Sequence, residues 1–116
     1  MKTYERPGEE LEFTAPAGGV TSGTGVKIGD ILVIATTTAA AGERFLGLRV
    51  GVVEHAKLSA QAWTEGQRVL WDDVNKRFTT VTTGNFIAGA AAAAAANPSA
   101  TGKVLLYGTS LGAAQA

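Results

Sequence analysis

The sequence predicts an all-β fold: a small, single-domain β-sandwich or barrel, jelly-roll-like, with a flexible N-terminal arm and a flexible C-terminal tail. Three observations predict this class. Apolar and polar side chains alternate with a period of two in several segments, which is typical of half-buried strands. Turn residues separate these segments at the spacing expected of small sandwiches and barrels. The length of 116 residues is that of one domain.

The ends of the chain differ from its middle in composition. Residues 1–8 are polar and end in Pro7-Gly8, a turn signal, so we interpret them as an arm. Residues 108–116 are rich in Gly and Ala and are expected to form the flexible tail. The β domain is therefore expected to span residues 9–107.

The first half of the domain contains two strand patterns. The segment EELEFTA (9–15) places Leu11, Phe13 and Ala15 on one face and Glu10, Glu12 and Thr14 on the other. Turns are predicted at PAGG (16–19) and SGTG (22–25). Residues 31–35 then form a continuous β-branched and apolar run, which is typical of a strand covered on both faces.

A longer alternating stretch, ERFLGLRVGVVEH, occupies residues 43–55. One face carries Leu46, Leu48, Val50 and Val52, and the other carries Gly47, Arg49 and Gly51. Two glycines inside a strand pattern predict a bend or a close approach of another backbone.

The second half contains a hairpin and a last strand. The segment RVLWDDVNKRFTTVTT (68–83) predicts a strand up to Trp71, a polar turn at residues 72–76 and a second strand at residues 77–81. The segment GKVLLYG (102–108) predicts the last strand.

The alanine-rich stretch FIAGAAAAAAA (86–96) has two interpretations. A helix is supported by Asn85 as an N-cap and by Asn97-Pro98 as a stop. However, the stretch is short for a stable helix, contains Gly89, and lacks both an amphipathic stripe and a charged residue. We favour a strand, whose small side chains would let another backbone approach closely, and keep the helix as the alternative.

Charge and composition exclude several classes of function. Lys plus Arg and Asp plus Glu each number 10, so the formal net charge is zero. This balance argues against binding to nucleic acid or to an anionic membrane, both of which favour a basic excess. The chain has no cysteine, which excludes disulfides and thiolate metal sites. Only 17% of the residues are charged, and a neutral, charge-poor surface tends to associate.

No motif predicts catalysis. Residues 108–112 (GTSLG) have the pattern of a nucleophile elbow around Ser110, but no Asp or His follows, and His55 lies upstream. Residues 23–29 depart from the dinucleotide-binding spacing and precede a strand where a helix is required. Residues 72–75 resemble part of a calcium loop, but an Asx turn explains them better. We therefore predict no enzymatic activity, no cofactor and no metal.

A set of short motifs occurs in a fixed order along the chain. The first motif is Y-x-x-P-G-E-x-L-E-F-T-A-P-A-G-G-V-x-S-G at residues 4–23. The others are IGDILVIA (28–35), AAAGE (39–43), GVVEHAK (51–57), AWTEGQRVLWD (62–72), TTGN (82–85) and ATGKVLL (100–106). Taken together in this order, these motifs resemble the small capsid cement, or decoration, proteins of tailed phages, and the resemblance covers nearly the whole chain.

The resemblance implies a structural role without catalysis or cofactor. It implies a protein that binds the outer surface of a phage head and stabilises contacts between subunits of the major capsid protein. It also implies an all-β fold, homodimers or homotrimers, synthesis in the host cytoplasm and a final place on the virion. The alternative is a phage tail or head-completion structural protein, or a fibre-attachment platform.

Two sets of residues are expected to contact partners. Lys2, Tyr4 and Arg6 of the arm are expected to contact the capsid, because a polar segment before a strand can add to the edge of a partner's sheet. Ala92 and Ala94 are expected to pack against a neighbouring subunit, because their small side chains permit close approach.

Overall fold

The computed structural model describes residues 9–108 and 111–115, and these residues form strands, turns and loops. Within this part of the chain there is no helix long and apolar enough to cross a membrane. The strands are β1 (Glu10–Thr14), β2 (Gly25–Ile28), β3 (Ile31–Ala35), β4 (Arg44–Leu48), β5 (Gly51–Ala56), β6 (Arg68–Asp72), β7 (Arg77–Thr79), β8 (Phe86–Ala91) and β9 (Thr101–Leu106). The predicted all-β class is confirmed.

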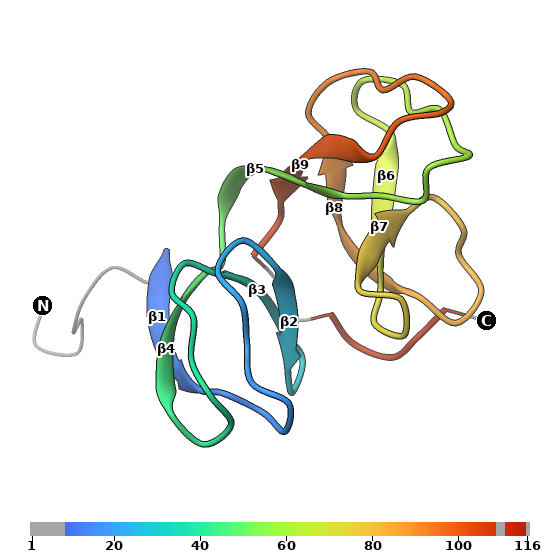
Figure 1. Cartoon of the computed structure of the whole chain (residues 1–116). Coiled ribbons are helices and arrows are strands. Elements are labelled where there is room, and N and C mark those ends of the chain that lie inside the picture. The colour runs from blue at the N-terminus through green and yellow to red at the C-terminus, as the bar shows by residue number, and fades with distance from the viewer. Residues whose placement is uncertain (1–8, 109–110, 116) are drawn as a thin grey trace, which may run out of the picture.

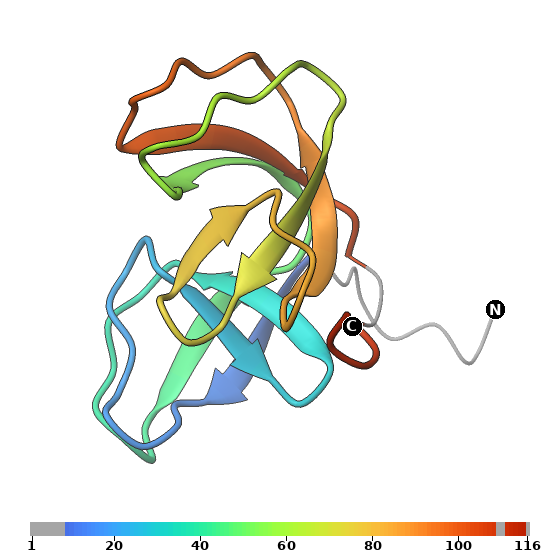
Figure 2. The ribbon, with the colours of Figure 1, turned by 90° about the vertical axis from the view of Figure 1, so that its right-hand side faces the viewer.

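The strands form two antiparallel sheets, one from each half of the described chain (Figure 1). The first sheet has the order β1-β4-β3-β2 and the second has the order β5-β9-β8-β6-β7. The second sheet curls into a half-barrel, so that the residues after β5 lie beside β7, where the Leu58 N–H donates to the Phe78 carbonyl at 2.9 Å. Figure 2 shows the second sheet lying over the first.

Strand β3 joins two hydrophobic cores. Val33 and Ala35 point into the smaller core, which also contains Ala15, Val20, Val26, Ala39 and Phe45. Leu32 and Ile34 point the other way, into the larger core, which also contains Trp63, Val69, Trp71, Phe78, Ala88, Ala91, Val104, Leu106 and Leu111. The apolar run at residues 31–35 is therefore covered on both faces, as its composition predicts.

The alternating stretch at residues 43–55 does not form one strand. It divides at Arg49 and Val50 into β4 and β5, which belong to different sheets. Gly51 follows the division with a φ of 113°, a backbone conformation that glycine adopts readily. Gly47 serves a different purpose, because a Cβ at this position would come within 2.6 Å of a Val33 methyl carbon. One glycine permits the bend and the other permits the close approach.

The predicted hairpin forms from β6 and β7, and the strand interpretation of the alanine-rich stretch is confirmed for its first part, β8. Gly89 lies opposite Leu106 in the β8–β9 pairing, and a Cβ on Gly89 would collide with the backbone oxygen of Leu105. Residues 92–93 then form a bend, and Ala95 pairs with Trp63 through backbone hydrogen bonds of 2.9 and 3.0 Å. Small residues therefore permit close backbone packing along this stretch.

The described residues of the C-terminal segment, for which the sequence predicts a tail, pack against the fold. Leu111 is buried in the larger core, and its N–H donates to the Asp30 carbonyl at 2.7 Å. Gln115 exchanges backbone hydrogen bonds with the loop before β8, through the Gly84 N–H and the Asn85 carbonyl. Burial of one large apolar side chain and these hydrogen bonds hold residues 111–115 in place.

Candidate functional site

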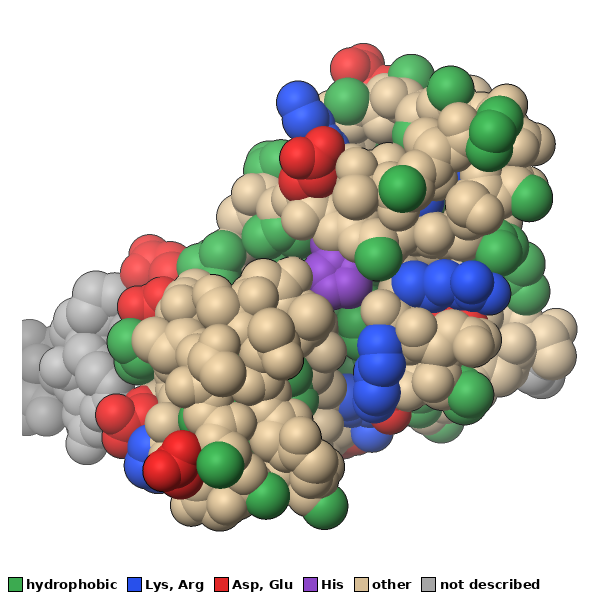
Figure 3. Space-filling view, viewed as in Figure 1, with side chains coloured by type: hydrophobic (Ala, Val, Ile, Leu, Met, Phe, Trp, Pro, Cys, Tyr) green, Lys and Arg blue, Asp and Glu red, His purple; other side chains and the backbone are tan. Residues whose placement is uncertain are grey.

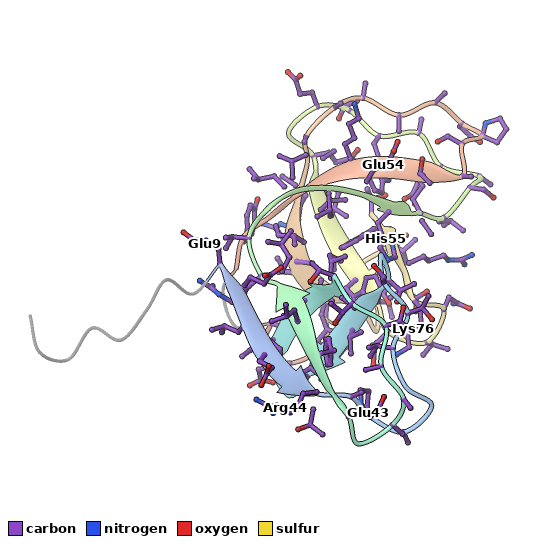
Figure 4. The ribbon with its side chains drawn as sticks, turned by 60° about the vertical axis from the view of Figure 1, so that its left-hand side comes forward. Glu9, Glu43, Arg44, Glu54, His55 and Lys76 are labelled. Atoms are coloured by element: carbon purple, nitrogen blue, oxygen red, sulfur yellow. The ribbon has the colours of Figure 1, made fainter. Side chains whose placement is uncertain are left out.

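His55 lies at the junction between the two sheets, where Figure 4 shows its side chain pointing toward the first sheet. Its Nε2 accepts a hydrogen bond of 2.9 Å from the Gly25 N–H at the edge of β2. Its Nδ1 lies 3.1 Å from the Ala56 carbonyl, so the neutral ring carries its proton on Nδ1. Trp71 and Phe78 pack edge-to-face against the ring, with centroids 5.4 and 5.2 Å away. Burial lowers the pKa of His55, and this environment gives the histidine a structural role.

Lys57 is a second buried basic residue, with 3% of its surface exposed. Its Nζ donates to the carbonyls of Leu58, Gln61 and Ser99, and lies 5.5 Å from the centre of the Trp63 ring. Burial lowers the pKa of Lys57. The ammonium group thus joins the loop after β5 to the loop before β9, and its donors are used within the fold.

The remaining polar groups of the described residues do not assemble a metal site. A shallow depression of about 260 Å³ lies between the loop at residues 16–25 and Lys76, whose Nζ is held by Asp73 at 2.8 Å. Asp72 caps its own turn by accepting from the Val74 and Asn75 N–H groups, as the Asx interpretation predicts. No three His, Cys, Asp or Glu side chains in the described residues could hold a metal ion. Ser110 lies outside the described residues.

The edge of β1 is one candidate interaction site. Among the described strands, β1 pairs on one side only, with β4. The Arg49 N–H donates to the Glu9 carbonyl and the Ala15 N–H to the Glu43 carbonyl, so alternate residues of β1 bond to β4. The backbone groups of Glu10, Glu12 and Thr14 therefore face the open side.

Side chains partly protect this edge. Arg44 bonds the Glu12 carboxylate at 3.0 Å and the Glu12 carbonyl at 3.2 Å. The exposed glutamates of β1 add charge, which discourages unspecific pairing of edge strands. Figure 4 shows this edge running from Glu9, where residues 1–8 join the fold, toward Arg44.

The outer face of β5, β9 and β8 is a second candidate interaction site. Val52 lies opposite Leu105, and Glu54 lies opposite Lys103, in the β5–β9 register. Ala90 of β8 lies beside Leu105 on the other side. Figure 3 shows hydrophobic side chains over this part of the second sheet with acidic and basic side chains nearby. We call these five residues the outer ladder.

The structure describes one of the two sets of predicted contact residues. Ala92 and Ala94 follow β8 next to the outer ladder, Ala92 half-buried and Ala94 exposed, and the Ala92 N–H donates to the Lys103 carbonyl at 2.8 Å. The predicted contact residues of the arm, Lys2, Tyr4 and Arg6, lie outside the described residues.

None of the five members of the outer ladder was predicted from the sequence to contact a partner. For the two members on β9 the sequence does contain a signal, because in GKVLLYG the exposed Lys103, Leu105 and Tyr107 alternate with buried residues that include Val104 and Leu106.

A β-rich fold that exposes a sheet edge and a partly apolar sheet face is suited to a binding module of structural type. A model of the phage cement protein family matches residues 6–106, and the chain belongs to this family. A search of curated proteins and a search of solved structures each found no match. The protein thus has a structural role in cementing a phage capsid, and the resemblance in its sequence motifs is confirmed.

Proposed function

We propose that the protein binds the outer surface of a phage head and clamps neighbouring subunits of the major capsid protein, without catalytic activity of its own. The family places its role at the capsid. The observation that carries the finer proposal is the open edge of β1, which directly follows the arm. A sheet edge and an extended segment next to it are the parts that add strands across protein interfaces.

The proposed contact runs from the arm into β1. Lys2, Tyr4 and Arg6 supply charge and an aromatic ring, and the backbone groups of Glu10, Glu12 and Thr14 continue the line of donors and acceptors. A capsid segment paired with this line would gain main-chain hydrogen bonds, while the glutamates would select basic neighbours.

Cementing requires little free energy from each contact. An interface of roughly 1,600 Å² spans micromolar to tighter affinities, depending on its quality. A molecule that holds two capsid subunits must break two contacts to leave, and the second contact forms at high effective concentration. Modest contacts repeated over a closed shell therefore resist its expansion.

We propose further that the protein is made in the host cytoplasm and acts as a homodimer or homotrimer. Its low content of charged residues, 17%, supports self-association. Ala92 and Ala94 remain proposed contacts to a neighbouring subunit.

Binding to undecorated heads tests the proposed contact. Deletion of residues 2–6 is expected to lower occupancy at limiting protein by about tenfold, a loss of ~1.4 kcal/mol. Occupancy is measured by pelleting the heads and quantifying the bound protein. Val74→Ser provides a control, because Val74 is exposed in the β6–β7 turn, far along the chain from β1. Unchanged occupancy after the deletion would remove the arm from the mechanism.

The edge of β1 is tested by a matched pair of variants. Glu12→Pro removes the backbone N–H that faces the open side, while Glu12→Ala keeps it, and both remove the carboxylate contact to Arg44 but keep the Glu12 carbonyl. Weaker head binding by Glu12→Pro than by Glu12→Ala is expected, with circular dichroism confirming that both variants fold. Equal binding by the two would contradict strand addition at this edge.

A further inference from the structure

The two strands of the β5–β9 pair carry apolar side chains where an outer strand face normally carries polar ones. Val52, Leu105 and Tyr107 are 59%, 44% and 48% exposed. On the opposite face of β9, Val104 and Leu106 fill the larger core. The second half of β9 is thus apolar on both faces, a pattern typical of strands that are covered on both sides. Within the described residues of a single chain, no strand covers the outer one of these faces.

The residues beside this apolar centre are small or charged. Ala90 flanks Leu105, and Ala92 follows it along the same side of the sheet. Small side chains let a second sheet approach to the usual spacing of about 10 Å. Glu54 and Lys103 lie side by side in the next row, both exposed, and the Thr101 hydroxyl donates to Glu54 at 3.3 Å.

The register of the outer ladder makes it complementary to itself. A two-fold axis parallel to the strands and midway between β5 and β9 exchanges the positions of the two strands. Such an axis places Val52 against Leu105 of the partner subunit, and Glu54 against Lys103 of the partner subunit. Each acidic side chain then meets a basic one, and each apolar side chain meets an apolar one.

We propose that the outer ladder is the surface on which a second copy of this chain docks, face to face, about this two-fold axis. The inference deepens the proposed function and rests on it for the role of the dimer, since a two-fold pair of modules presents two β1 edges to the capsid. The outer ladder alone is smaller than the roughly 800 Å² that each partner buries in a standard interface. Association in the micromolar range is therefore expected, reinforced where copies are concentrated on a head.

Sedimentation of the full chain over a range of concentrations tests the docking surface. The wild-type protein is expected to show a monomer–dimer equilibrium, and Val52→Asp and Leu105→Asp are expected to weaken it at least tenfold. Val74→Asp is the matched control, because Val74 is 88% exposed in the turn between β6 and β7 and should leave the equilibrium unchanged. Far-ultraviolet dichroism and thermal melts establish that the exposed substitutions leave each variant folded.

Charge exchange tests the symmetry itself. Glu54→Lys and Lys103→Glu each place like charges across both pairs of a homodimer, so each variant is expected to be monomeric. A mixture of the two variants places opposite charges across both pairs and is expected to recover dimers. Recovery that weakens with added salt supports the two-fold arrangement.

Three results would overturn the inference. They are a wild-type protein that stays monomeric at all concentrations, a mixture that does not recover dimers, and a Val52→Asp variant that keeps its dimer but loses head binding. The last result would identify the outer ladder as a capsid contact instead. Failure of the proposed function is distinguishable, because the arm and β1 variants change head occupancy while the sedimentation assay contains no heads.

Discussion

His55 accepts a hydrogen bond from the Gly25 N–H, so its Nε2 must stay unprotonated while the two sheets remain joined. Burial lowers its pKa below the ordinary value of 6.5, so the unfolded chain takes up a proton at higher pH than the folded chain. The stability that His55 contributes is therefore complete above pH 6.5 and decreases as the pH falls from 6.5 toward the lowered pKa. We expect a lower melting temperature at about pH 5.5 than at about pH 7.5.

The variant His55→Gln separates this effect from the titration of carboxylates. Its amide oxygen can accept the Gly25 hydrogen bond but does not titrate, so the difference in melting temperature between the two pH values should decrease. Thermal melts followed by circular dichroism measure both proteins. An equal pH dependence in wild type and variant would show that other groups cause it.

For a single residue, the sequence predicts the strand or turn that contains it better than the residue with which it forms a hydrogen bond. His55 was predicted to lie on a strand, and it does. The donor to its Nε2 comes from Gly25, 30 residues earlier, on a strand of the other sheet. That pairing depends on how the two sheets meet, which no local pattern encodes. The Asx turn at Asp72 was predictable, because its hydrogen bonds span only two and three residues.

Strand β8 depends on one glycine within the alanine-rich stretch. A Cβ on Gly89 would collide with the backbone oxygen of Leu105, which cannot move without breaking the β8–β9 pairing. We therefore expect Gly89→Ala to lower the free energy of unfolding by about 1–3 kcal/mol or more, as overpacking does. Ala90→Ser on the neighbouring, half-exposed position should change it by less than about 0.5 kcal/mol. Urea denaturation measures both, and equal effects would contradict the close approach.

At the scale of elements, alternation and turn residues predicted the strands because each signal is local. The hairpin of β6 and β7 and the double coverage of β3 followed from such patterns. The division of residues 43–55 into strands of two sheets was only indicated, by glycines that suggested a bend. The partly exposed face of this stretch includes Leu46 and Val52, while its buried residues include Phe45 and His55. Hydrophobic alternation could not show which of the two faces is buried, because the apolar face that carries Leu46 and Val52 lies on the outer surface.

At the scale of the whole molecule, the two cores are expected to unfold together. Strand β3 contributes Val33 to the smaller core and Leu32 and Ile34 to the larger one, so neither core persists once β3 is lost. His55, Leu111 and the short β4–β5 connection further join the two sheets. A single cooperative transition follows from this sharing, although each half of the chain forms its own sheet.

The tryptophans make this expectation measurable, because Trp63 and Trp71 both lie in the larger core. Val33→Ala removes two methyl groups from a fully buried site in the smaller core and should cost about 2 kcal/mol. If the molecule is one cooperative unit, this substitution shifts the unfolding curve recorded by tryptophan fluorescence as far as the curve recorded by far-ultraviolet dichroism. Val104→Ala in the larger core provides the comparison and should shift both curves similarly. If Val33→Ala does not shift the unfolding curve recorded by tryptophan fluorescence, the two sheets unfold separately. In that case a load applied through β1 on a capsid could open the first sheet while the second remained folded.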